Sequence, residues 1–382
     1  MKKTFFIIFF TLLFGKIFSQ IQSYHVSEAN IKIKDNPIFY YLPKTSLNIH
    51  FETETEYFVP GPFCKFADKY LLIKDVSIEK KTKSSIKNIS ISEYSIADEK
   101  NCYFVVEKNF DYKLSLTNLG ILTSYNYLVA NSDYEIFPQI ENSNNKFDNT
   151  IPTYTDFGVK RNFTDKTDTT YKVIEVDSVF QKIPVYNQVI TSKNFEQKAE
   201  EAANYIIKIR KRRFKLQSGQ FENDTPPNNV TELIEELNNL EQQYTELFVG
   251  KKIIINNEFS LNYIPEQSEE ITIAYLSDEN GIIETKENNA KPITLKIEKV
   301  ENNYKIENFY KSHNLNTQNV GLYYVNPGMA DITIKFNNIE VSKTKILLPQ
   351  FGFINSLPAK MFSNKNLKII FDDKKGAIKS IF

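Results

Sequence analysis

The chain has 382 residues, with 47 Lys and Arg against 47 Asp and Glu, only 2 Cys and 3 His, and no Trp. This length predicts two or three domains, and an apolar fraction of 41% excludes wholesale disorder. The balanced charge argues against a dedicated nucleic-acid-binding protein, whose domains usually have a pI above about 9, and two cysteines exclude a four-thiolate zinc site.

Residues 1–20 have the layout of an export signal. Lys2 and Lys3 precede an apolar run over residues 5–14. A short basic segment followed by about ten apolar residues is typical of a secretory signal peptide, and such a run is too short to span the roughly 30 Å hydrocarbon core of a bilayer. We expect cleavage at the end of this segment and export to the periplasm or the outer-membrane periphery, with no transmembrane segment in the mature chain. The alternative is an N-terminal anchor that is retained.

Residues 21–135 have the period of β-strands and are predicted to form an N-terminal β domain. In the segment 46–54, Leu47, Ile49 and Phe51 alternate with polar residues, as in a strand that is buried on one face. Further strands with similar cues are expected at 86–91, 102–106 and 112–116.

Residues 136–193 are predicted to be a long linker that contains strand segments. The stretch 141–170 is rich in Asn, Asp and Thr and has little periodicity. Such a composition favours a long surface loop.

Residues 194–250 change abruptly to a helical period. A first helix is expected after Asn194, a typical N-cap residue, and Gly219 is a typical stop. A second helix is expected after Asn229, which forms a capping-box pattern with Glu232. Two prolines lie in the short connection, and this arrangement predicts an antiparallel helical hairpin.

Residues 251–382 return to the strand period and are predicted to form a C-terminal antiparallel β domain. The clearest strands are expected at 271–275, 293–297, 332–336 and 367–371, the last in a hairpin whose loop is 372–376. No helices alternate with these strands, so parallel βαβ units are excluded. The predicted fold is therefore mainly β, with two antiparallel, sandwich-like β domains and an inserted helical hairpin.

The order of these segments resembles a known family. The resemblance rests on short motifs along most of the chain: Tyr40-Tyr41-Leu42-Pro43, Gly61-Pro62-Phe63, Leu119-Gly120-Ile121-Leu122, Ile209-Arg210-Lys211-Arg212-Arg213-Phe214, Leu247-Phe248-Val249-Gly250 and Gln350-Phe351-Gly352. The chain resembles the exported proteins of Bacteroidetes-type bacteria that form domain-of-unknown-function family 4831. The resemblance implies that the helical hairpin belongs to the fold, and it implies no reaction, substrate or catalytic residue.

The strongest charge feature is a basic cluster at the end of the first predicted helix. Its members are Lys208, Arg210, Lys211, Arg212, Arg213 and Lys215. The cluster is a candidate site for an anionic partner, such as a phosphate, a lipid head group or an acidic envelope protein. The alternative is structural. An antiparallel hairpin brings the cluster to the same end as three acids, which are Glu232, Glu235 and Glu236.

The two cysteines, Cys64 and Cys102, both fall in the predicted N-terminal β domain. Export would permit a disulfide between them, which would stabilise the fold by about 3–4 kcal/mol in the chain-entropy model. Because aromatic residues surround both, two buried free thiols are the alternative interpretation.

The three histidines form no nucleophile or metal-binding pattern. His50 shares a strand face with Glu52 and Glu54, which is more typical of a solvated polar face than of a metal site. We therefore predict no catalytic, cofactor-binding or metal-binding residue.

These features favour an exported, non-catalytic binding or assembly protein of the cell envelope. One alternative is a glycan-processing hydrolase, which would require two carboxyl groups about 5–10 Å apart in a cleft, one with a raised pKa. Another is a surface glycan-binding module, which would require exposed tyrosine side chains.

Overall fold

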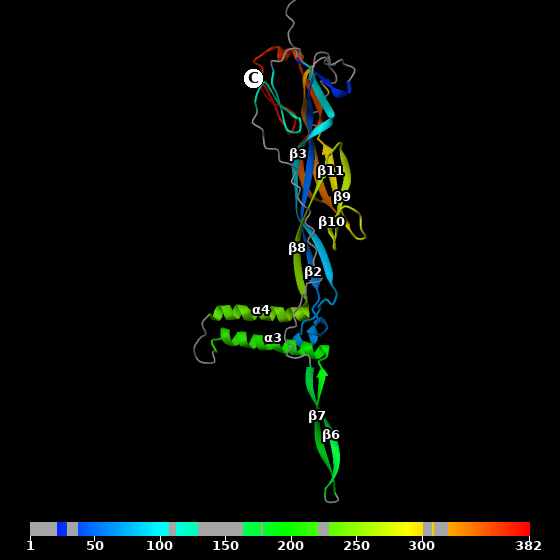
Figure 1. Cartoon of the computed structure of the whole chain (residues 1–382), viewed down its shortest axis with the longest axis vertical. Helices are drawn as coiled ribbons and strands as arrows, with labels where there is room; N and C mark the ends of the chain where they lie inside the picture. The colour runs from blue at the N-terminus through cyan, green and yellow to red at the C-terminus, as the bar shows by residue number, and fades with distance from the viewer. Residues whose placement is uncertain are drawn as a thin grey trace, which may run out of the picture. The chain divides into compact units, whose positions relative to one another are not determined.

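The computed structural model describes residues 21–28, 37–106, 112–128, 163–176, 179–220, 229–300, 308 and 320–382. Its strands form four sheets in this part of the chain, and the fold is mainly β, as predicted (Figure 1). The predicted segment 1–20 and most of the polar stretch 141–170 lie outside the described residues.

Two of the sheets are large, and their strands are antiparallel wherever the pairing is described. The first has the order β1-β3-β2-β8, formed by Gln22–His25, Lys81–Val106, Ile38–Val59 and Lys251–Tyr263. The second has the order β10-β9-β11-β12-β13, formed by Gly281–Ile283, Glu269–Ser277, Lys291–Lys299, Val320–Phe336 and Ile339–Pro358.

Two smaller sheets and a few helices complete the described fold. The third sheet has the order β15-β14-β5-β4, formed by Ile378–Ile381, Ile369–Phe371, Leu122–Tyr125 and Leu114–Leu116. The fourth is a ribbon of β6 and β7, which are Phe163–Val176 and Val179–Ser192. The α-helices are α2, α3 and α4, which span Ala67–Leu71, Phe195–Gln217 and Val230–Val249. The 3₁₀ helices are η1, η2 and η4, which span Val26–Glu28, Cys64–Phe66 and Ala359–Ser363.

Contacts divide the chain into two units that are interleaved along the sequence, whereas the sequence predicted consecutive domains. The first unit takes the described residues within Met1–Thr53, Ser85–Asn144 and Asn257–Phe382. The second takes those within Glu54–Ser84 and Asn145–Asn256. The long strands β2, β3 and β8 contribute residues to both.

The largest core of the first unit lies between the two large sheets. Leu47, Ile49 and Phe51 of β2 are fully buried, as predicted, but Ser46 and Asn48 on the opposite face are buried too, so the alternation appears only from His50 onward. They belong to the same apolar cluster as Ile293 and Leu295 of β11. Fully burying a side chain of this size contributes about 1.5–3 kcal/mol. Segments that the sequence assigned to separate β domains therefore share one sandwich-like core.

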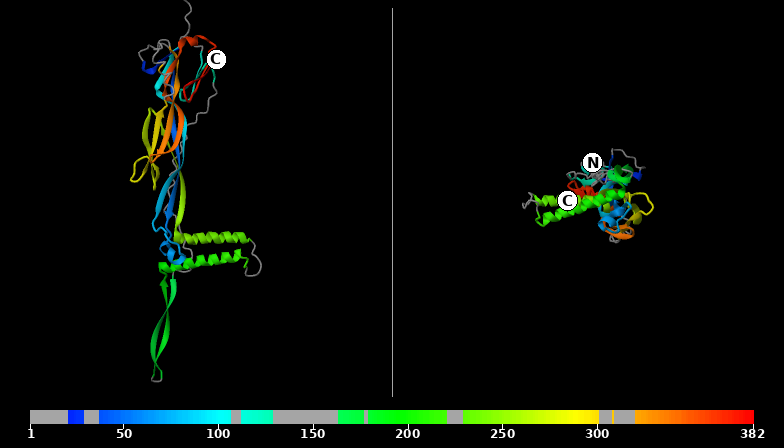
Figure 2. Two further views of the ribbon diagram at one scale, coloured as in Figure 1. Left: turned by 180° about the vertical axis from the view of Figure 1, so that it is seen from behind. Right: turned by 90° about the horizontal axis from the view of Figure 1, so that it is seen from below.

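The core of the second unit holds the helical hairpin. Ala202 and Ile206 of α3 are fully buried and cluster with Leu247 and Phe248 of α4 and with Phe63, which precedes η2. The small side chain of Ala202 leaves room for the neighbouring helix to approach closely. Figure 2 shows α3 and α4 running side by side. The predicted hairpin over 194–250 is thus confirmed.

The two helices begin differently. At α3 the Asn194 side chain accepts from the backbone N–H of Gln197, and the Gln197 side chain accepts from the backbone of Asn194, which is a complete capping box. At α4 the predicted capping box is wrong. Asn229 has a left-handed backbone with φ of 67° and caps no N–H, since its amide Nδ2 instead donates to Glu232 Oε2 at 2.9 Å.

The β6–β7 ribbon includes residues that the sequence predicted as a loop. The polar residues 163–170 were predicted as a loop, but they form the first half of β6. Their register with β7 is continuous from Phe163 opposite Ser192 to Val176 opposite Val179. Threonine, which favours strands, recurs through this segment and outweighs its polarity.

Candidate binding surface on the helical hairpin

Two pairs of side chains fix the alignment of α3 and α4. The rings of Tyr205 and Tyr244 stack with centroids 5.7 Å apart. Further along α3, Arg210 contacts Glu241 of α4. Since partners lie progressively earlier in α4 as the chain advances along α3, the helices are antiparallel. The arginines of the basic cluster therefore lie beside the middle of α4, whereas the sequence predicted the start of that helix.

Two of the six predicted basic residues are part of this helix–helix contact. Arg210 Nε donates to Glu241 Oε1 at 2.7 Å, and Arg213 Nη1 donates to Glu241 Oε2 and, at 2.8 Å, to Asn238 Oδ1. The Glu241 side chain is only 15% exposed, so its charge is well shielded and is neutralised by both arginines. An open hollow of about 460 Å³ beside these residues is lined by both arginines and by Asn238 and Glu241, which pair with one another, and by four further residues of α4.

The other four basic residues form an outward face of α3, which we call the basic stripe. The stripe consists of Lys208, Lys211, Arg212 and Lys215. Their spacing of three, four and seven residues places them on one side of a helix, and all four are exposed. In the described part of the chain, the ion pairs of this cluster are made by Arg210 and Arg213. No acid occurs between residues 202 and 221.

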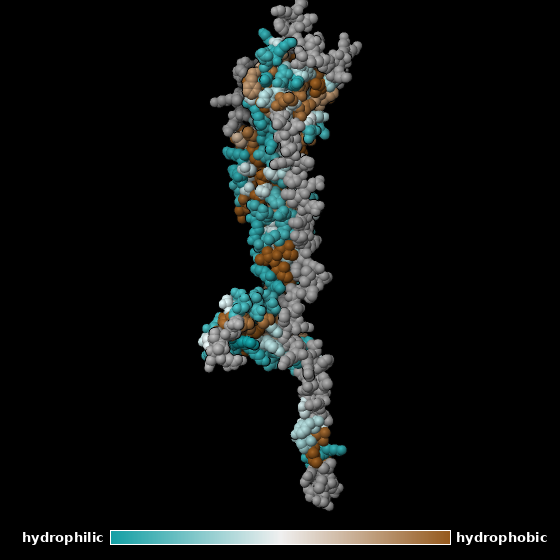
Figure 3. Space-filling view, turned by 60° about the vertical axis from the view of Figure 1, so that its left-hand side comes forward, coloured by the Kyte–Doolittle hydropathy of each residue, from teal (hydrophilic) through white to brown (hydrophobic). Residues whose placement is uncertain are grey.

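Apolar side chains flank the basic stripe. Ile207 is 40% exposed and Phe214 is 65% exposed. They are seven residues apart, so they share one side of α3. On the helical hairpin, Figure 3 shows brown apolar surface beside teal hydrophilic surface. The exposed side of α3 is therefore amphipathic.

The predicted acidic partners of the cluster are not the ones used. Glu232, Glu235 and Glu236 are exposed, and Glu232 accepts from Asn229. The acid that pairs with the arginines is Glu241, which follows the predicted acids further along α4. Sequence reasoning missed it because the lengths of the helices and their connection leave the alignment of the hairpin open. The charge pattern of the two helices does not by itself show which acid faces the arginines.

The sequence was compared with models of known protein families. The family model described as "Domain of unknown function (DUF4831)" matches residues 36–379, which is nearly the whole chain and includes both helices of the hairpin. The protein belongs to the DUF4831 family. No curated protein and no solved structure matches the chain.

Both cysteines of this DUF4831 protein are free thiols in the structure. Cys64 lies in η2 and belongs to the second unit, whereas Cys102 lies in β3 and belongs to the first. Burial raises the pKa of the Cys102 thiol, and a hydrogen bond with Tyr41 partly offsets this effect. The pairing of these two residues was a candidate disulfide, and the structure provides no bond for it.

We therefore expect the purified protein to have one intact mass with and without reductant. Alkylation of Cys102 should accelerate as the pH rises above neutral, because the thiolate is the reacting form and the raised pKa keeps the thiol protonated at neutral pH. Mass spectrometry of alkylated peptides measures both. A mass increase on reduction, together with alkylation of Cys64 and Cys102 only after reduction, would establish the disulfide instead.

Two of the histidines, His25 and His50, are described and make ordinary polar contacts. His313 lies outside the described residues. His50 Nδ1 lies 2.8 Å from Ser260 Oγ, and Glu52 accepts from Asn88 Nδ2 at 3.3 Å. His25 Nε2 donates to the carbonyl of Lys100 at 2.9 Å. Among the described residues, no group of three or more His, Cys, Asp or Glu is arranged to hold a metal ion.

Within the described segments, the carboxyl groups with a shifted pKa are shifted in the direction opposite to that of a general acid. A lysine hydrogen bond lowers the pKa of Glu196, of Glu266 and of Glu298, and each lies at the surface. A glycosidase acid requires a raised pKa. These groups therefore do not favour the hydrolase interpretation.

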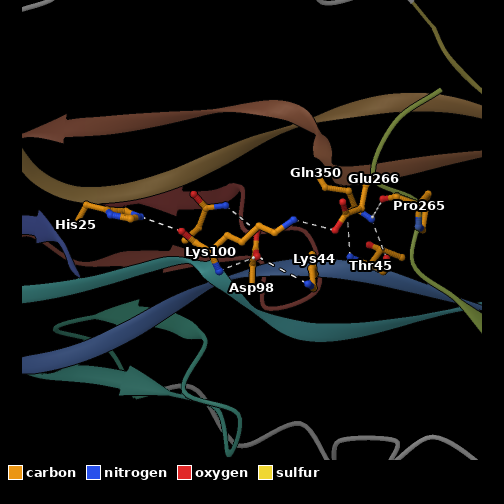
Figure 4. A network of polar contacts seen from close by, with 9 residues as sticks. His25, Lys44, Thr45, Asp98, Lys100, Pro265, Glu266 and Gln350 are labelled. Carbon is orange, nitrogen blue, oxygen red and sulfur yellow. Dashed lines mark hydrogen bonds and ion pairs between the residues drawn. The ribbon is translucent and has the colours of Figure 1, made fainter. Parts of the chain in front are cut away.

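A network of polar contacts in the first unit joins several strands (Figure 4). Asp98 accepts from the backbone N–H of Lys100 at 3.2 Å and from Asn101 Nδ2 at 2.6 Å. The Lys100 ammonium donates to Glu266 at 2.9 Å, but both side chains are largely exposed and such a pair contributes little to stability. The network is best explained as structural.

Gln350 of β13 makes three hydrogen bonds in this network. Its Oε1 accepts from the backbone N–H of Thr45 at 3.0 Å, and its Nε2 donates to the carbonyls of Thr45 at 2.8 Å and Pro265 at 3.1 Å. It thereby joins β2, β13 and the segment after β8 within the first unit.

Replacing Gln350 with Ala should lower the free energy of unfolding by about 1–3 kcal/mol, because backbone groups of Thr45 and Pro265 lose their partner. Gln350→Glu should lose a similar amount, since a carboxylate cannot donate to the two carbonyls. Urea unfolding measures the difference. Gln243→Ala, at an exposed position of α4, is the control, and equal stability of all these variants would contradict the assigned role.

Among the described residues, no helix combines the length and the apolar character needed to cross a membrane.

Proposed function

We propose that this protein is an exported, non-catalytic binding or assembly protein of the cell envelope, and that it binds an anionic partner through the basic stripe. The observation that carries the proposal is the division of the six basic residues. Arg210 and Arg213 share an ion pair with Glu241 within the hairpin, whereas the four residues of the stripe are exposed and have no acid on their own stretch of helix.

The hairpin presents the stripe on a rigid base. At the base of α3, Ala202 and Ile206 are fully buried against α4, and the shared contact with Glu241 holds the outer half of α3 in place. A partner that binds the stripe therefore does not have to order the helix first, and this lowers the entropic cost of binding. Four like charges close together also favour anionic partners at long range, an effect that salt screens.

A photoreactive crosslinker on the hairpin tests this proposal in cells. Placed at Lys211 in the stripe, it should yield crosslinked envelope material, and placed at Glu235 on α4, also exposed, it should not. Raising the salt concentration during crosslinking of isolated envelopes should weaken the Lys211 product. Equal crosslinking at both positions, or none at either, would contradict binding through the stripe.

Export is the second part of the proposal, and the basic and apolar layout of residues 1–20 supports it. In the structure Ile21 is 2% exposed and belongs to an apolar core, which supports a cleavage point at or before residue 20. N-terminal sequencing of the protein from its native cells should therefore begin near Ile21. An intact N-terminus beginning at Met1 would contradict removal of the signal.

A second candidate function, glycan binding, is favoured by two tyrosines on the β6–β7 ribbon. Tyr171 and Tyr186 are 66% and 68% exposed. The register places Tyr171 opposite Pro184 and Tyr186 opposite Thr169, so both tyrosines lie on one face as diagonal neighbours. Exposed amphipathic rings of this kind can stack on the apolar faces of sugars.

Tyr171→Ala and Tyr186→Ala should each weaken binding to envelope polysaccharide, as measured by affinity electrophoresis, if the ribbon binds glycans. Val185→Ala is the matched control, because Val185 lies opposite Thr170 on the other face of the ribbon. A wild-type protein that migrates equally with and without polysaccharide would eliminate this candidate.

A further inference from the structure

We propose that the partner of the basic stripe is the surface of a bilayer that contains anionic lipids, with Phe214 and Ile207 entering the head-group region. This inference rests on the proposed function, because it names the class of partner for the same surface. It is independent of the tyrosines on the ribbon.

The extent of the stripe favours a surface over a single phosphate. Residues 208 to 215 rise about 10 Å along the helix axis, at 1.5 Å per residue. The charged groups are therefore spread along a line rather than gathered around one point. A single phosphate is typically held by side chains that converge on it. A linear array of exposed basic residues suits a plane of head groups, where each contributes separately.

The apolar flank distinguishes a bilayer from a soluble acidic partner. Phe214 and Ile207 lie beside the stripe, and Phe214 keeps 65% of its surface exposed. Lys and Arg on a polar face with large apolar residues along its edge are typical of a helix that lies in a membrane interface. The long side chains of Lys211 and Lys215 can bury their methylene groups while their ammonium groups reach the phosphates.

Co-sedimentation with vesicles tests the inference on the full-length mature chain. We expect the protein to bind vesicles of phosphatidylglycerol and phosphatidylcholine in equal parts, and not vesicles of phosphatidylcholine alone. Changing all four residues of the stripe to Gln should weaken binding by more than about a hundredfold, since each basic residue near an anionic surface contributes roughly a factor of five. Phe214→Ser should weaken it by about tenfold and leave its salt dependence unchanged.

A second four-residue variant controls for the change in net charge. It carries Gln at four exposed lysines of the same unit, Lys74, Lys80, Lys81 and Lys83. This variant should bind vesicles like the wild type. Circular dichroism of each variant should retain the helical signal, because none of the changed side chains is buried. Equal weakening by the control variant would show that only net charge matters and would overturn the inference.

The remaining outcomes separate this inference from the proposed function. Binding to a soluble polyanion such as heparin, dependent on the stripe but without vesicle binding, would overturn the bilayer and leave the proposed function standing. If the protein binds neither heparin nor vesicles, both the bilayer inference and the proposed function are overturned. If light scattering instead shows self-association that the stripe variant abolishes, then the exposed Glu232, Glu235 and Glu236 of a second copy are the partner and the bilayer is excluded.

Discussion

Replacing Gly352 with Ala should lower the free energy of unfolding by about 3 kcal/mol or more, the largest effect we expect from a single added methyl group. A Cβ at this position would lie 1.8 Å from the carbonyl oxygen of Asn326 and 2.8 Å from Cα of Pro327. Both neighbours are backbone atoms, so no side chain can rotate away. The pairing of β12 with β13 shifts register at this point, between Asn326 and Gly328, which brings the two backbones together.

The control for this variant is Gly281→Ala, at the first residue of β10 in the same unit. Gly281 has φ of +69° and nothing within 4 Å of an added Cβ. Its replacement should cost about 1 kcal/mol, from the left-handed backbone alone. Urea unfolding of the two variants is compared by circular dichroism, because the chain has no Trp whose fluorescence could report unfolding. Equal losses of unfolding free energy in the two variants would mean that the backbone around Gly352 can move to accommodate a Cβ.

Phe248→Ala should lower the free energy of unfolding of the second unit by about 3–5 kcal/mol. The Phe248 side chain is fully buried, and its ring centroid lies 5.5 Å from that of Phe63. Its removal leaves a cavity at the base of the hairpin, beside Ala202 and Ile206. We expect faster hydrogen exchange in α3 and α4, measured by mass spectrometry.

The control on the same hairpin is Phe214→Ala. Phe214 is 65% exposed, so the loss of its ring should change the free energy of unfolding by less than about 0.5 kcal/mol. Comparable destabilisation by both changes would show that Phe214 packs against the protein. It would then be unavailable to a partner, and the inference about the bilayer would lose its apolar contact.

Local features of the fold could be predicted from the sequence because they depend on neighbouring residues. The alternation of Leu47, Ile49 and Phe51 predicted a strand with one buried face, and that face is fully buried. The Asn194 cap and the period after it predicted α3, whose capping box is complete. The hairpin loop over 372–376 is also found, with Gly376 at φ of +70°.

Features that depend on distant segments could not be predicted in this way. A period of two shows which face of β2 is buried, but it does not show that β11, more than 200 residues later, covers that face. The sequence therefore predicted two consecutive β domains. For the same reason, the sequence identified the six basic residues but not the two that pair with Glu241.

The left-handed Asn229 shows a different limit. Its pattern with Glu232 matches a capping box, but the backbone at that residue is left-handed, so the amide bonds the carboxylate rather than a helix N–H. A motif specifies which groups can meet. The backbone conformation, which is set by the rest of the hairpin, decides which of them do.

The most direct test of the central claim is the partition of the protein between the envelope and soluble fractions of its native cells. The wild-type protein should sediment with the envelope and be released by added salt, because its attachment is electrostatic. A variant with Gln at all four positions of the basic stripe should be found in the soluble fraction, whereas the variant changed at Lys74, Lys80, Lys81 and Lys83 should sediment like the wild type. Sedimentation of the stripe variant with the envelope, at wild-type levels, would contradict the account.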